Sequence, residues 1–458
     1  MRYRSRMQAL KSGAEGWVKR NRSMKDRRII RYIGSESGES ALRIADMPYS
    51  KSYLLRVMTM IGVEGCTLPL RHWDAGARGC DDVSLMQRAV LLLSEGNSDR
   101  ICVGAAGAVW RFMIALSALR TDHPLHFVTE GRLAHRPILP LIETLNQWGA
   151  RIVATHSGKG IEVSLTPSDK PLCGGSLAND VLAETSQFGS ALMLIAPALL
   201  DGLTLSGAEN VPSSRYLELT ASLMQRGGAD VCTDQGGYTV RSSHYNEARL
   251  GAMLTAPERD WSAASYPYGW VAQENGPQAL LLEGYRMEDL QGDKRIAEDF
   301  ASLGVASCFV SDGVLLRRNK ERKLQPEYRF DLGANPDLAP AYAATLLGLG
   351  TPFALTNLSR LAFKESNRLE SVCHMAESFG FALYRMGDSL HFDGKKPAAM
   401  PFVSVDPQED HRLAMASTIL TLATKCATEL QEPLVADKSF RSFYPVARQV
   451  GFRLTECN

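Results

Sequence analysis

The sequence has no CxxC pair, and no histidine cluster stands beside any of its cysteines. Its nine cysteines are scattered over 458 residues. A zinc site needs closely spaced thiolate or imidazole ligands, and a disulfide framework needs many cysteines in a short secreted chain. The spacing therefore predicts reduced thiols in a cytoplasmic protein without a metal site, and no motif in the chain indicates a cofactor.

Long apolar runs are also missing. A membrane-spanning helix needs about 20 consecutive apolar residues, whereas the longest apolar stretches here, such as residues 191–200, are soon interrupted by proline or glycine. The composition, with 45% hydrophobic and 22% charged residues, is that of a folded protein. A chain of this length can form two or more domains. We therefore expect a globular protein with no membrane partner.

The net charge is only +1, but it is unevenly distributed. Residues 1–28 contain ten lysines and arginines and two acidic residues, so the rest of the chain is mildly acidic. Such a segment can bind nucleic acid or direct a protein to an organelle, but it has no apolar core of a secretory signal. The favoured interpretation is a basic, poorly ordered extension over residues 1–34, and no nucleic-acid partner is expected.

A helix–glycine–strand pattern recurs six times. Each copy has an amphipathic segment with apolar residues three and four positions apart, then a glycine where a left-handed helix end is expected, and in most copies a β-type run. One such glycine is common, whereas six at similar intervals indicate an internal repeat. The glycines are Gly96, Gly149, Gly227, Gly304, Gly380 and Gly451.

A second series of helices alternates with the first and is more apolar on all sides, which indicates that these helices are buried. The repeating unit therefore has one buried helix, one helix facing solvent and several strands. Six such units exceed one compact core, so we expect an α/β protein with two lobes. The buried helices are expected to start near Lys51, Gly107, Ser186, Ser262, Asp337 and Asp410.

Positively charged side chains gather at the starts of these helices. A helix N-terminus presents free N–H groups and the positive end of the helix dipole, so a cation there costs roughly a few tenths of a kcal/mol unless an anion lies nearby. Arginine grips phosphate or carboxylate through two parallel hydrogen bonds. The pattern predicts a site for polyanionic ligands. The cations in these positions are Lys51, Arg136, Arg368, Arg412 and Lys438.

Two acidic residues, Asp337 and Glu365, lie among these cations, and His411 precedes Arg412. Each carboxylate could be a salt-bridge partner, or it could transfer protons beside a bound substrate. His411 could transfer protons or hold an orienting hydrogen bond. The spacing leaves both interpretations open for all three residues. Serine and aspartate at the helix starts can likewise be helix caps or anion ligands.

Several short segments, in order from residue 36 onward, resemble those of the 5-enolpyruvylshikimate-3-phosphate (EPSP) synthase family. The last of them is the most specific. The segments are Tyr49-Ser-Lys-Ser52 with Arg56, Gly104-Ala-Ala-Gly107 with Arg111, Arg136-Pro137, Ser186-Gln-Phe188, Asp260 to Tyr266, Pro336-Asp337, Lys364-Glu365 with Arg368, and Asp410-His-Arg-Leu-Ala-Met415.

This resemblance implies a two-lobed inverse α/β barrel of the enolpyruvyl transferase type, made of six βαβαββ repeats. One lobe is expected from residues 35–49 with 259–458, and the other from residues 50–258. The implied reaction is transfer of the enolpyruvyl group of phosphoenolpyruvate to the 5-hydroxyl of shikimate 3-phosphate, with release of phosphate, in the shikimate pathway of aromatic amino acid biosynthesis. The expected partners are these two small molecules, and the protein is expected to be a monomer.

The resemblance also assigns roles to individual residues. Asp337 or Lys51 is implied to assist deprotonation of the 5-hydroxyl, and Glu365 or Lys51 to protonate the methylene carbon; His411 completes the implied catalytic set. Shikimate 3-phosphate is implied to bind Ser52, Arg56, Thr185, Ser186, Ser213, Tyr216, Asp337 and Lys364. Phosphoenolpyruvate is implied to bind Lys51, Gly107, Arg136, Gln187, Arg368, Arg412 and Lys438.

The chain departs from the family pattern at several positions. Tyr49 takes a place usually given to glycine, Ala105 and Ala108 replace an amide and a hydroxyl, and Asn367 replaces an aspartate. These changes bear on phosphoenolpyruvate affinity and on sensitivity to analogues such as glyphosate. Two other functions stay open. One is a non-catalytic anion-binding relative; the other is UDP-N-acetylglucosamine enolpyruvyl transferase, whose family usually has asparagine at the position of Ser52.

Overall fold

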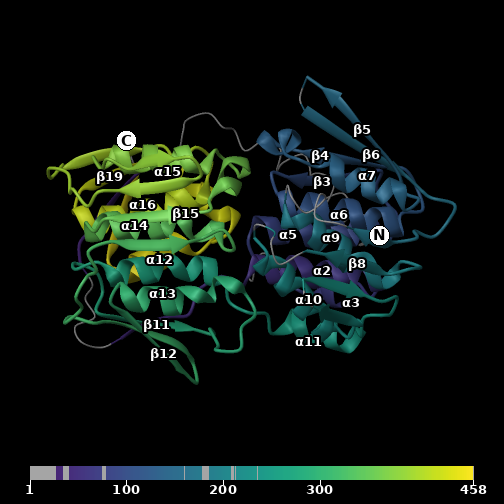
Figure 1. The fold of residues 1–458 in the computed structure, drawn as a ribbon, viewed down its shortest axis with the longest axis horizontal. Helices are drawn as coiled ribbons and strands as arrows, with labels where there is room; N and C mark the ends of the chain where they lie inside the picture. Colours follow the sequence, from purple (N-terminus) through teal and green to yellow (C-terminus); the bar gives the residue numbers. More distant parts are fainter. Residues whose placement is uncertain are drawn as a thin grey trace, which may run out of the picture.

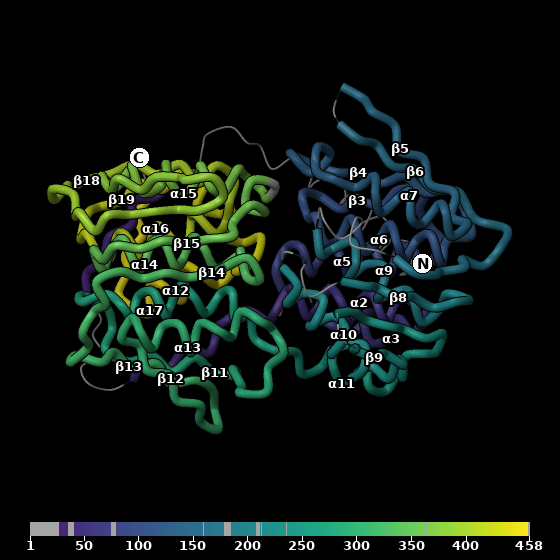
Figure 2. Tube along the Cα trace, in the orientation of Figure 1, coloured from purple at the N-terminus to yellow at the C-terminus, as the bar shows by residue number. Residues whose placement is uncertain are grey.

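The computed structural model describes residues 27–34, 41–74, 79–158, 160–177, 185–207, 211, 213–234 and 236–456. Two lobes lie side by side (Figure 1), and the chain trace in Figure 2 runs from purple to teal in one and from teal to yellow in the other. Each has its own hydrophobic core. Lobe 1 is the part built on the core that includes residues 261–452, and lobe 2 is built on the core within residues 53–254.

Three buried helices form the centre of lobe 1: α12 (Trp261–Ala272), α14 (Ala339–Leu349) and α16 (His411–Thr424). They pack against one another, and nearly all of their residues are buried, as the sequence predicted. A helix that is apolar on all sides has no face suited to water, so it is stable only inside a core. No helix in the described part of the chain is long and apolar enough to cross a bilayer.

Three four-stranded sheets and three further helices surround this centre. In strand order, the first sheet is β18 (Phe402–Val405), β19 (Ala427–Gln431), β1 (Arg27–Tyr32) and β20 (Phe452–Glu456). The second is β12 (Val305–Val310), β13 (Gly313–Arg318), β11 (Ala279–Glu283) and β2 (Leu42–Ile44). The third is β14 (Tyr328–Asp331), β15 (Phe353–Thr356), β17 (Ser389–Phe392) and β16 (Tyr384–Met386). The further helices are α13 (Ile296–Ser302), α15 (Arg368–Ser378) and α17 (Phe443–Val450), with short 3-10 turns η4 (Gly292–Arg295), η5 (Pro336–Leu338), η6 (Ser359–Phe363) and η7 (Pro433–Lys438).

Lobe 2 repeats this plan around α2 (Lys51–Glu64), α6 (Gly107–Arg120) and α9 (Ser186–Ile195). The paired outer helices are α5 (Asp81–Glu95), α7 (Leu139–Gln147) and α10 (Arg215–Gly227), joined by α3 (Leu68–His72), α11 (Glu247–Thr255), η1 (Gly131–His135) and η2 (Ala196–Ala198). Its sheets are β3 (Arg100–Gly104), β4 (Leu125–Thr129), β6 (Gly160–Thr166) and β5 (Arg151–Ser157); and β7 (Gly175–Leu177), β8 (Leu203–Ser206), β10 (Gly237–Val240) and β9 (Val231–Asp234).

The first unit of lobe 2 is shorter than the others. From α5 the chain passes through Gly96 directly into β3, which belongs to the sheet of the next unit. Pairs of helices therefore recur six times, whereas the described residues form five four-stranded sheets. The short interval from Gly96 to Gly149 in the sequence reflects this difference.

Five of the six predicted helix-terminal glycines have the expected left-handed backbone. The exception is Gly227, which is the last residue of α10, while Gly228 adopts the left-handed conformation with φ of 99°. The sequence pattern could not show which of the two adjacent glycines, Gly227 or Gly228, has the left-handed backbone. The other five are Gly96, Gly149, Gly304, Gly380 and Gly451, with φ values of 62°, 108°, 83°, 80° and 114°.

The predicted basic extension over residues 1–34 reaches too far. Its first 26 residues lie outside the described part of the chain, but Arg27–Tyr32 form β1, between β19 and β20 in a lobe 1 sheet. The side chain of Ile30 enters the core, whereas Arg27 and Arg31 are exposed. The prediction failed because the arginines of this strand were counted with the basic segment before it.

The chain passes between the lobes at two adjacent places. Tyr49 and Arg259 form an isolated antiparallel bridge, and the Ser50 N–H donates a hydrogen bond to the Glu258 carbonyl at 2.8 Å. The Arg259 guanidinium lies 4.4 Å from the centre of the Tyr49 ring, a cation–π distance. Because α2 and α12 begin directly after these crossings, their N-termini meet between the lobes.

The helix-terminal glycines give a test of the fold. Replacing Gly228 by alanine is expected to lower the free energy of unfolding by about 1 kcal/mol, because a left-handed backbone is unfavourable for a residue with Cβ. Gly251→Ala is the matched control. It lies inside α11, where an added Cβ meets nothing within 4 Å, so it should stabilise the protein by about 0.5 kcal/mol. Urea unfolding measures the free energy of unfolding of both variants. Equal changes of the same sign would contradict the assignment of Gly228 as the left-handed helix end.

Candidate active site

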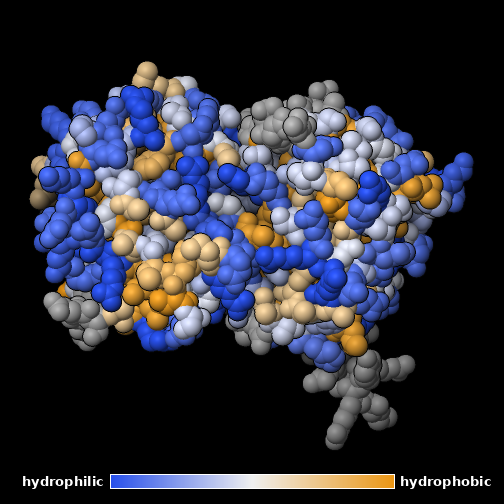
Figure 3. Space-filling view, turned by 60° about the horizontal axis from the view of Figure 1, so that its bottom comes forward, coloured by the Kyte–Doolittle hydropathy of each residue, from blue (hydrophilic) through white to orange (hydrophobic). Residues whose placement is uncertain are grey.

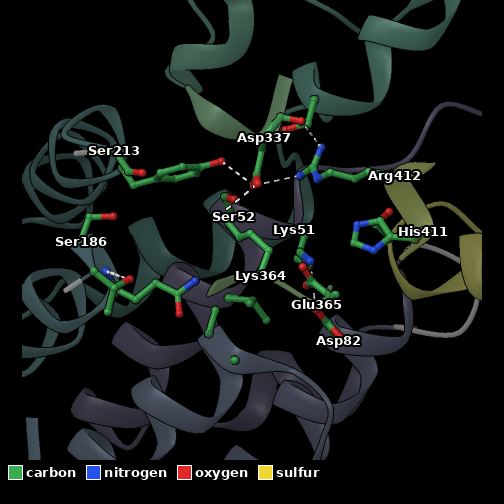
Figure 4. A pocket seen from close by; sticks show the side chains of 18 of the residues that line it. Lys51, Ser52, Asp82, Ser186, Ser213, Asp337, Lys364, Glu365, His411 and Arg412 are labelled. Atoms are coloured by element: carbon green, nitrogen blue, oxygen red, sulfur yellow. Dashed lines mark hydrogen bonds and ion pairs between the residues drawn. The ribbon is translucent and has the colours of Figure 1, made fainter. Parts of the chain in front are cut away.

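The N-terminal ends of helices from both lobes converge on one cleft. Figure 4 shows Lys51 and Ser52 of lobe 2 facing Asp337, Lys364 and Glu365 of lobe 1. The cleft contains every site residue predicted from the sequence except Lys438, which contacts Glu365 at its edge. Its lining includes Lys51, Ser52, Arg56, Asp82, Gly107, Arg111, Arg136, Thr185, Ser186, Gln187, Ser213, Tyr216, Asp337, Arg360, Lys364, Glu365, Arg368, His411, Arg412 and Ser439.

Asp337, in η5 just before α14, is the meeting point of three cations. Its Oδ1 lies 3.2 Å from Lys364 Nζ and 2.9 Å from Arg368 Nη1, and its Oδ2 lies 3.0 Å from Arg412 Nη2. Across the cleft, the Tyr216 hydroxyl donates a hydrogen bond to Oδ2 at 3.2 Å. Burial opposes ionisation, but the three cations outweigh it and hold the pKa of Asp337 well below its usual range.

Arg368, the first residue of α15, is completely buried. Its Nε and Nη2 donate to the two oxygens of Asp410 at 2.7 and 3.1 Å, and Nη2 also donates to Glu365 at 2.8 Å. Asp410 in turn caps α16 by accepting the Arg412 N–H at 2.9 Å. A buried charge is tolerated only when it is paired and hydrogen-bonded, so this arrangement fixes the direction of the guanidinium.

Glu365 lies between two cations. Its Oε2 accepts from Arg368, and its Oε1 is 3.3 Å from Lys438 Nζ. Burial again opposes ionisation, but Lys438, Arg368 and Arg136 together hold the pKa of Glu365 well below its usual range. The carboxylate is therefore ionised at neutral pH.

Lys51, the first residue of α2, pairs with a carboxylate of its own lobe. Its Nζ is 2.9 Å from Asp82 Oδ2, at the start of α5. Burial lowers the pKa of Lys51, but the charge and hydrogen bond of Asp82, together with the nearby Cys80 and Glu365, outweigh burial, and the pKa lies above the ordinary lysine value. Lys51 is therefore an ammonium group, able to donate a proton and unable to accept one.

His411 is the first residue of α16 and is buried beside Glu365 and Lys51. Neither ring nitrogen has a hydrogen-bond partner among the described residues, and Nδ1 is 4.0 Å from Asp410. Burial holds the pKa of His411 well below its usual range, although Glu365 acts against this. A neutral imidazole can donate a hydrogen bond to a ligand, but it is a poor source of protons at neutral pH.

The start of α9 forms a polar wall of the cleft in lobe 2. The Thr185 hydroxyl caps this helix by accepting the Gln187 N–H at 3.3 Å, and Ser186 is its first residue. Ser213 has a left-handed backbone with φ of 65°, and its N–H donates to the Gly333 carbonyl of lobe 1 at 2.9 Å. Hydroxyl and free N–H groups at a helix N-terminus suit a phosphate.

Arg56 is more strongly engaged within the protein than the sequence prediction assumed. Its guanidinium donates to Thr220 Oγ1 at 2.7 Å, Ser190 Oγ at 3.0 Å and the Tyr216 carbonyl at 3.1 Å, and also to the Ser52 carbonyl at 2.7 Å. Burial lowers its pKa to about 10. Arg56 reaches the cleft, and these bonds fix its side chain between its own helix α2 and helices α9 and α10.

Arg136 is a cation of the cleft in lobe 2, near the start of α6. Its buried Nε has no hydrogen-bond partner in the described part of the chain. It lies against the start of α6, where a Cβ on Gly107 would be 2.7 Å from Arg136 Nη1 and 2.8 Å from Arg111 Nη1. A side chain at position 107 would therefore force one or both of these guanidinium groups to shift. Arg111 itself donates to Gln187 Oε1 at 2.6 Å.

The altered loop before α6 contacts the opposite lobe through its backbone. Lys438 Nζ donates to the carbonyl of Ala105 at 3.3 Å. The short side chain at position 105 does not affect this bond, because the backbone supplies the acceptor.

The sequence predictions missed the residues that hold the cations in place. Asp410 was noted only as a helix start and Arg111 only as part of a motif, and Asp82 was given no role. For Asp410 the available signal was an acidic residue two positions before the predicted ligand Arg412. Asp82 is 31 residues from Lys51 in the sequence, so no local signal indicated it. Among the described residues, no group of three or more His, Cys, Asp or Glu could hold a metal ion.

The two lobes and their shared cleft define a fold that is also found in solved enolpyruvyl transferases. The EPSP synthase from Acinetobacter baumannii matches with a TM-score of 0.65 and 16% identity, covering 94% of this chain and all of that one. The enolpyruvyl transferase NikO from Streptomyces tendae matches with a TM-score of 0.64 and 13% identity, covering 95% of this chain and all of that one. The fold is therefore that of the two-lobed enolpyruvyl transferases.

Sequence comparison identifies the family to which the chain belongs. The profile of the family described as EPSP synthase (3-phosphoshikimate 1-carboxyvinyltransferase) matches residues 80–446. A 3-phosphoshikimate 1-carboxyvinyltransferase of Bacteroides fragilis is 32% identical over 92% of this chain and 98% of its own length, and one of Syntrophobacter fumaroxidans is 29% identical over 76% and 79%. The chain belongs to the EPSP synthase family.

The environment of His411 predicts a pH dependence of stability. Because its folded pKa lies far below the unfolded value of about 6.5, the unfolded state binds the proton more readily, and stability falls as pH decreases through 6.5. Between pH 7.5 and 5.5 the wild type should lose about 1.4 kcal/mol more than His411→Gln. Urea unfolding at both pH values tests this. The exposed His135→Gln should follow the wild type, and parallel profiles for His411→Gln and wild type would contradict the expectation.

Proposed function

We propose that the protein transfers the enolpyruvyl group of phosphoenolpyruvate to the 5-hydroxyl of shikimate 3-phosphate and releases phosphate, as a 3-phosphoshikimate 1-carboxyvinyltransferase. The observation that carries the proposal is an excess of positive charge, since eight lysines and arginines and four acidic residues line the cleft. Both substrates carry phosphate and carboxylate groups and repel one another in water. A buried surplus of cations can neutralise both at once.

Shikimate 3-phosphate is placed against lobe 2 in this proposal. Its phosphate meets the start of α9 at Ser186, together with Thr185 and Ser213, where hydroxyl groups and free N–H groups lie at the positive end of the helix dipole. Its carboxylate and hydroxyls then lie near Asp337 and Lys364. The remaining ligands are Ser52, Arg56 and Tyr216, which line the same part of the cleft.

Phosphoenolpyruvate is placed between the start of α6 and the cations of lobe 1. The unpartnered Nε of Arg136 beside Gly107 supports this position, because a buried guanidinium is costly without an anion. Lys438 contacts Glu365 at 3.3 Å and Lys51 is close enough for its charge to interact with Glu365, so both lysines are available to a second anionic group. The other proposed ligands are Gln187, Arg368 and Arg412.

Asp337 is the proposed base for the 5-hydroxyl. Its low pKa makes it a carboxylate, whereas Lys51 is protonated and cannot accept a proton. Phosphate and carboxylate groups of bound substrates compete with Asp337 for Arg412 and Lys364. That competition weakens the ion pairs of Asp337 and raises its basicity at the moment when a base is needed.

The methylene carbon of phosphoenolpyruvate receives its proton from Glu365 or Lys51. Glu365 can act as an acid only if its pKa rises, which follows when bound anions neutralise Lys438 and Arg136. His411, being neutral, is proposed to orient a substrate by a hydrogen bond. It is not the proposed proton source.

The bond changes balance without a further reactant. The 5-oxygen bonds to C2 of phosphoenolpyruvate as its proton leaves to Asp337, and C3 gains a proton, which gives a tetrahedral ketal phosphate. Loss of a proton from C3 and of phosphate from C2 then restores the double bond. Proximity of the two bound substrates supplies much of the rate.

We also propose that the protein acts as a cytoplasmic monomer with lobes of residues 27–49 plus 259–458 and 50–258, lobe 1 being extended from the predicted 35–49 to include β1. The separate cores and the paired crossings at Tyr49 and Arg259 support this division. One chain supplies every described residue of the cleft, and large exposed apolar side chains are scattered along the chain. The face in Figure 3 shows them in patches separated by hydrophilic residues. The eight described cysteines are free, as in a reducing compartment.

A phosphate-release assay separates the remaining alternatives. Release that requires both phosphoenolpyruvate and shikimate 3-phosphate supports the proposed reaction. Release with UDP-N-acetylglucosamine in place of shikimate 3-phosphate indicates the sister transferase, and binding without release indicates a non-catalytic relative.

Glu365→Gln tests the proton-transfer assignment. The amide keeps the shape of the side chain but cannot deliver a proton, so kcat should fall by about 10² to 10⁴, while calorimetry should show nearly unchanged binding of shikimate 3-phosphate. Glu370→Gln is the matched control, since Glu370 is exposed in the first turn of α15, five residues after Glu365, and should retain wild-type turnover. Normal turnover of Glu365→Gln would exclude Glu365 as the acid.

A further inference from the structure

Outside the cleft, an ion pair joins the two lobes. Arg441 lies in lobe 1 between η7 and α17, and Asp81 is the first residue of α5 in lobe 2. Arg441 Nη2 and Nε donate to Asp81 Oδ1 at 2.7 and 3.1 Å, and Nη2 also donates to Ser84 Oγ at 3.2 Å. Neither Arg441 nor Asp81 lines the substrate cleft.

Each end of this pair adjoins a residue of the active site. Asp82, next to Asp81, is the carboxylate that holds Lys51 at 2.9 Å. On the other side, Lys438 lies three residues before Arg441 and contacts Glu365 at 3.3 Å. The pair therefore connects the helix start that orients Lys51 with the turn that carries Lys438.

Electrostatics favours Asp81 in this position. A carboxylate at the first residue of a helix is stabilised by the helix dipole, so an ionised Asp81 is favourable at this position independently of Arg441. The side chains of Arg441 and Asp81 are 29% and 38% exposed. At such exposure an ion pair contributes little to folding, so its role is to be sought in the arrangement of the lobes.

We propose that Arg441 is a positioning residue, which holds the start of α5 against lobe 1 so that Lys51 and the Lys438–Glu365 pair face one another across the cleft. The proposal rests on the proposed enolpyruvyl transfer. Arg441 touches neither substrate, and its contribution is equal in the ground state and the transition state. Loss of such uniform binding raises KM and leaves kcat nearly unchanged.

The test is a double-mutant cycle with Arg441→Gln and Asp81→Asn, assayed by phosphate release with varied phosphoenolpyruvate. Each single variant is expected to raise KM about threefold to tenfold, with kcat within twofold of wild type. The double variant should be no worse than either single variant, because both remove the same interaction. Arg441→Lys should recover part of the loss, since it restores the charge without the two-pronged contact.

A matched control is Arg241→Gln. Arg241 pairs with Asp230 at 3.0 Å within lobe 2, so its loss should leave KM unchanged. Thermal unfolding distinguishes positioning from misfolding, since Arg441→Gln should melt close to wild type. Unchanged KM in an active Arg441→Gln enzyme, or additive effects in the cycle, would overturn the positioning role. An inactive wild type would instead overturn the proposed reaction, and this role with it.

Discussion

The structure depends on the balance between cations at helix N-termini and the carboxylates that hold them. The helix dipole opposes a lysine or arginine in such a place, and burial adds a larger cost. Asp410, Asp337 and Glu365 offset these costs for the cations of lobe 1, and Asp82 does so for Lys51. The carboxylates do not cancel the positive charge of the cleft. They fix the orientation of the cationic side chains, and the surplus positive charge remains available to an anionic ligand.

This balance links binding to chemistry. A carboxylate held by several cations is a weak base and carries no proton to donate at neutral pH, as the low pKa values of Asp337 and Glu365 indicate. In the proposed mechanism, anionic substrates bind the same cations, and the two carboxylates lose part of their stabilisation. Proton transfer then becomes easier in the loaded enzyme than in the free enzyme. The proposed substrate ligands would therefore also control when the proposed acid and base become active.

Much of the fold was predictable from the sequence because it repeats. The buried helices of lobe 2 begin at the predicted residues Lys51, Gly107 and Ser186, those of lobe 1 begin within two residues of the predicted Ser262, Asp337 and Asp410, and the glycines located most helix ends. Strands were harder to predict. β1 was missed because its arginines resemble the basic segment before it, and the shortened first unit of lobe 2 was not recognised from its interval alone.

Residues of the candidate site were predictable where a lysine or arginine stands near a helix start, a position that the helix dipole makes unfavourable for a cation. Lys51, Arg368 and Arg412 were found because each is unfavourable there without an anion. Arg136 and Lys438 were found by the same reasoning, although they lie in the turns before α7 and α17. Partners such as Asp82 and Asp410 break no rule, since an acid at a helix start is favourable by itself. Their importance depends on which cation the fold brings near them, and that is a property of tertiary structure.

The paired crossing between the lobes explains why these distant residues can act together. A single flexible linker would leave the lobes free to separate, whereas two short segments joined by the Tyr49–Arg259 bridge restrict their relative motion. The starts of α2 and α12 emerge directly from this crossing. The helix starts nearest to it are therefore held close at little entropic cost. Those farther away, such as α5 and the turn before α17, need a contact of their own to meet across the cleft.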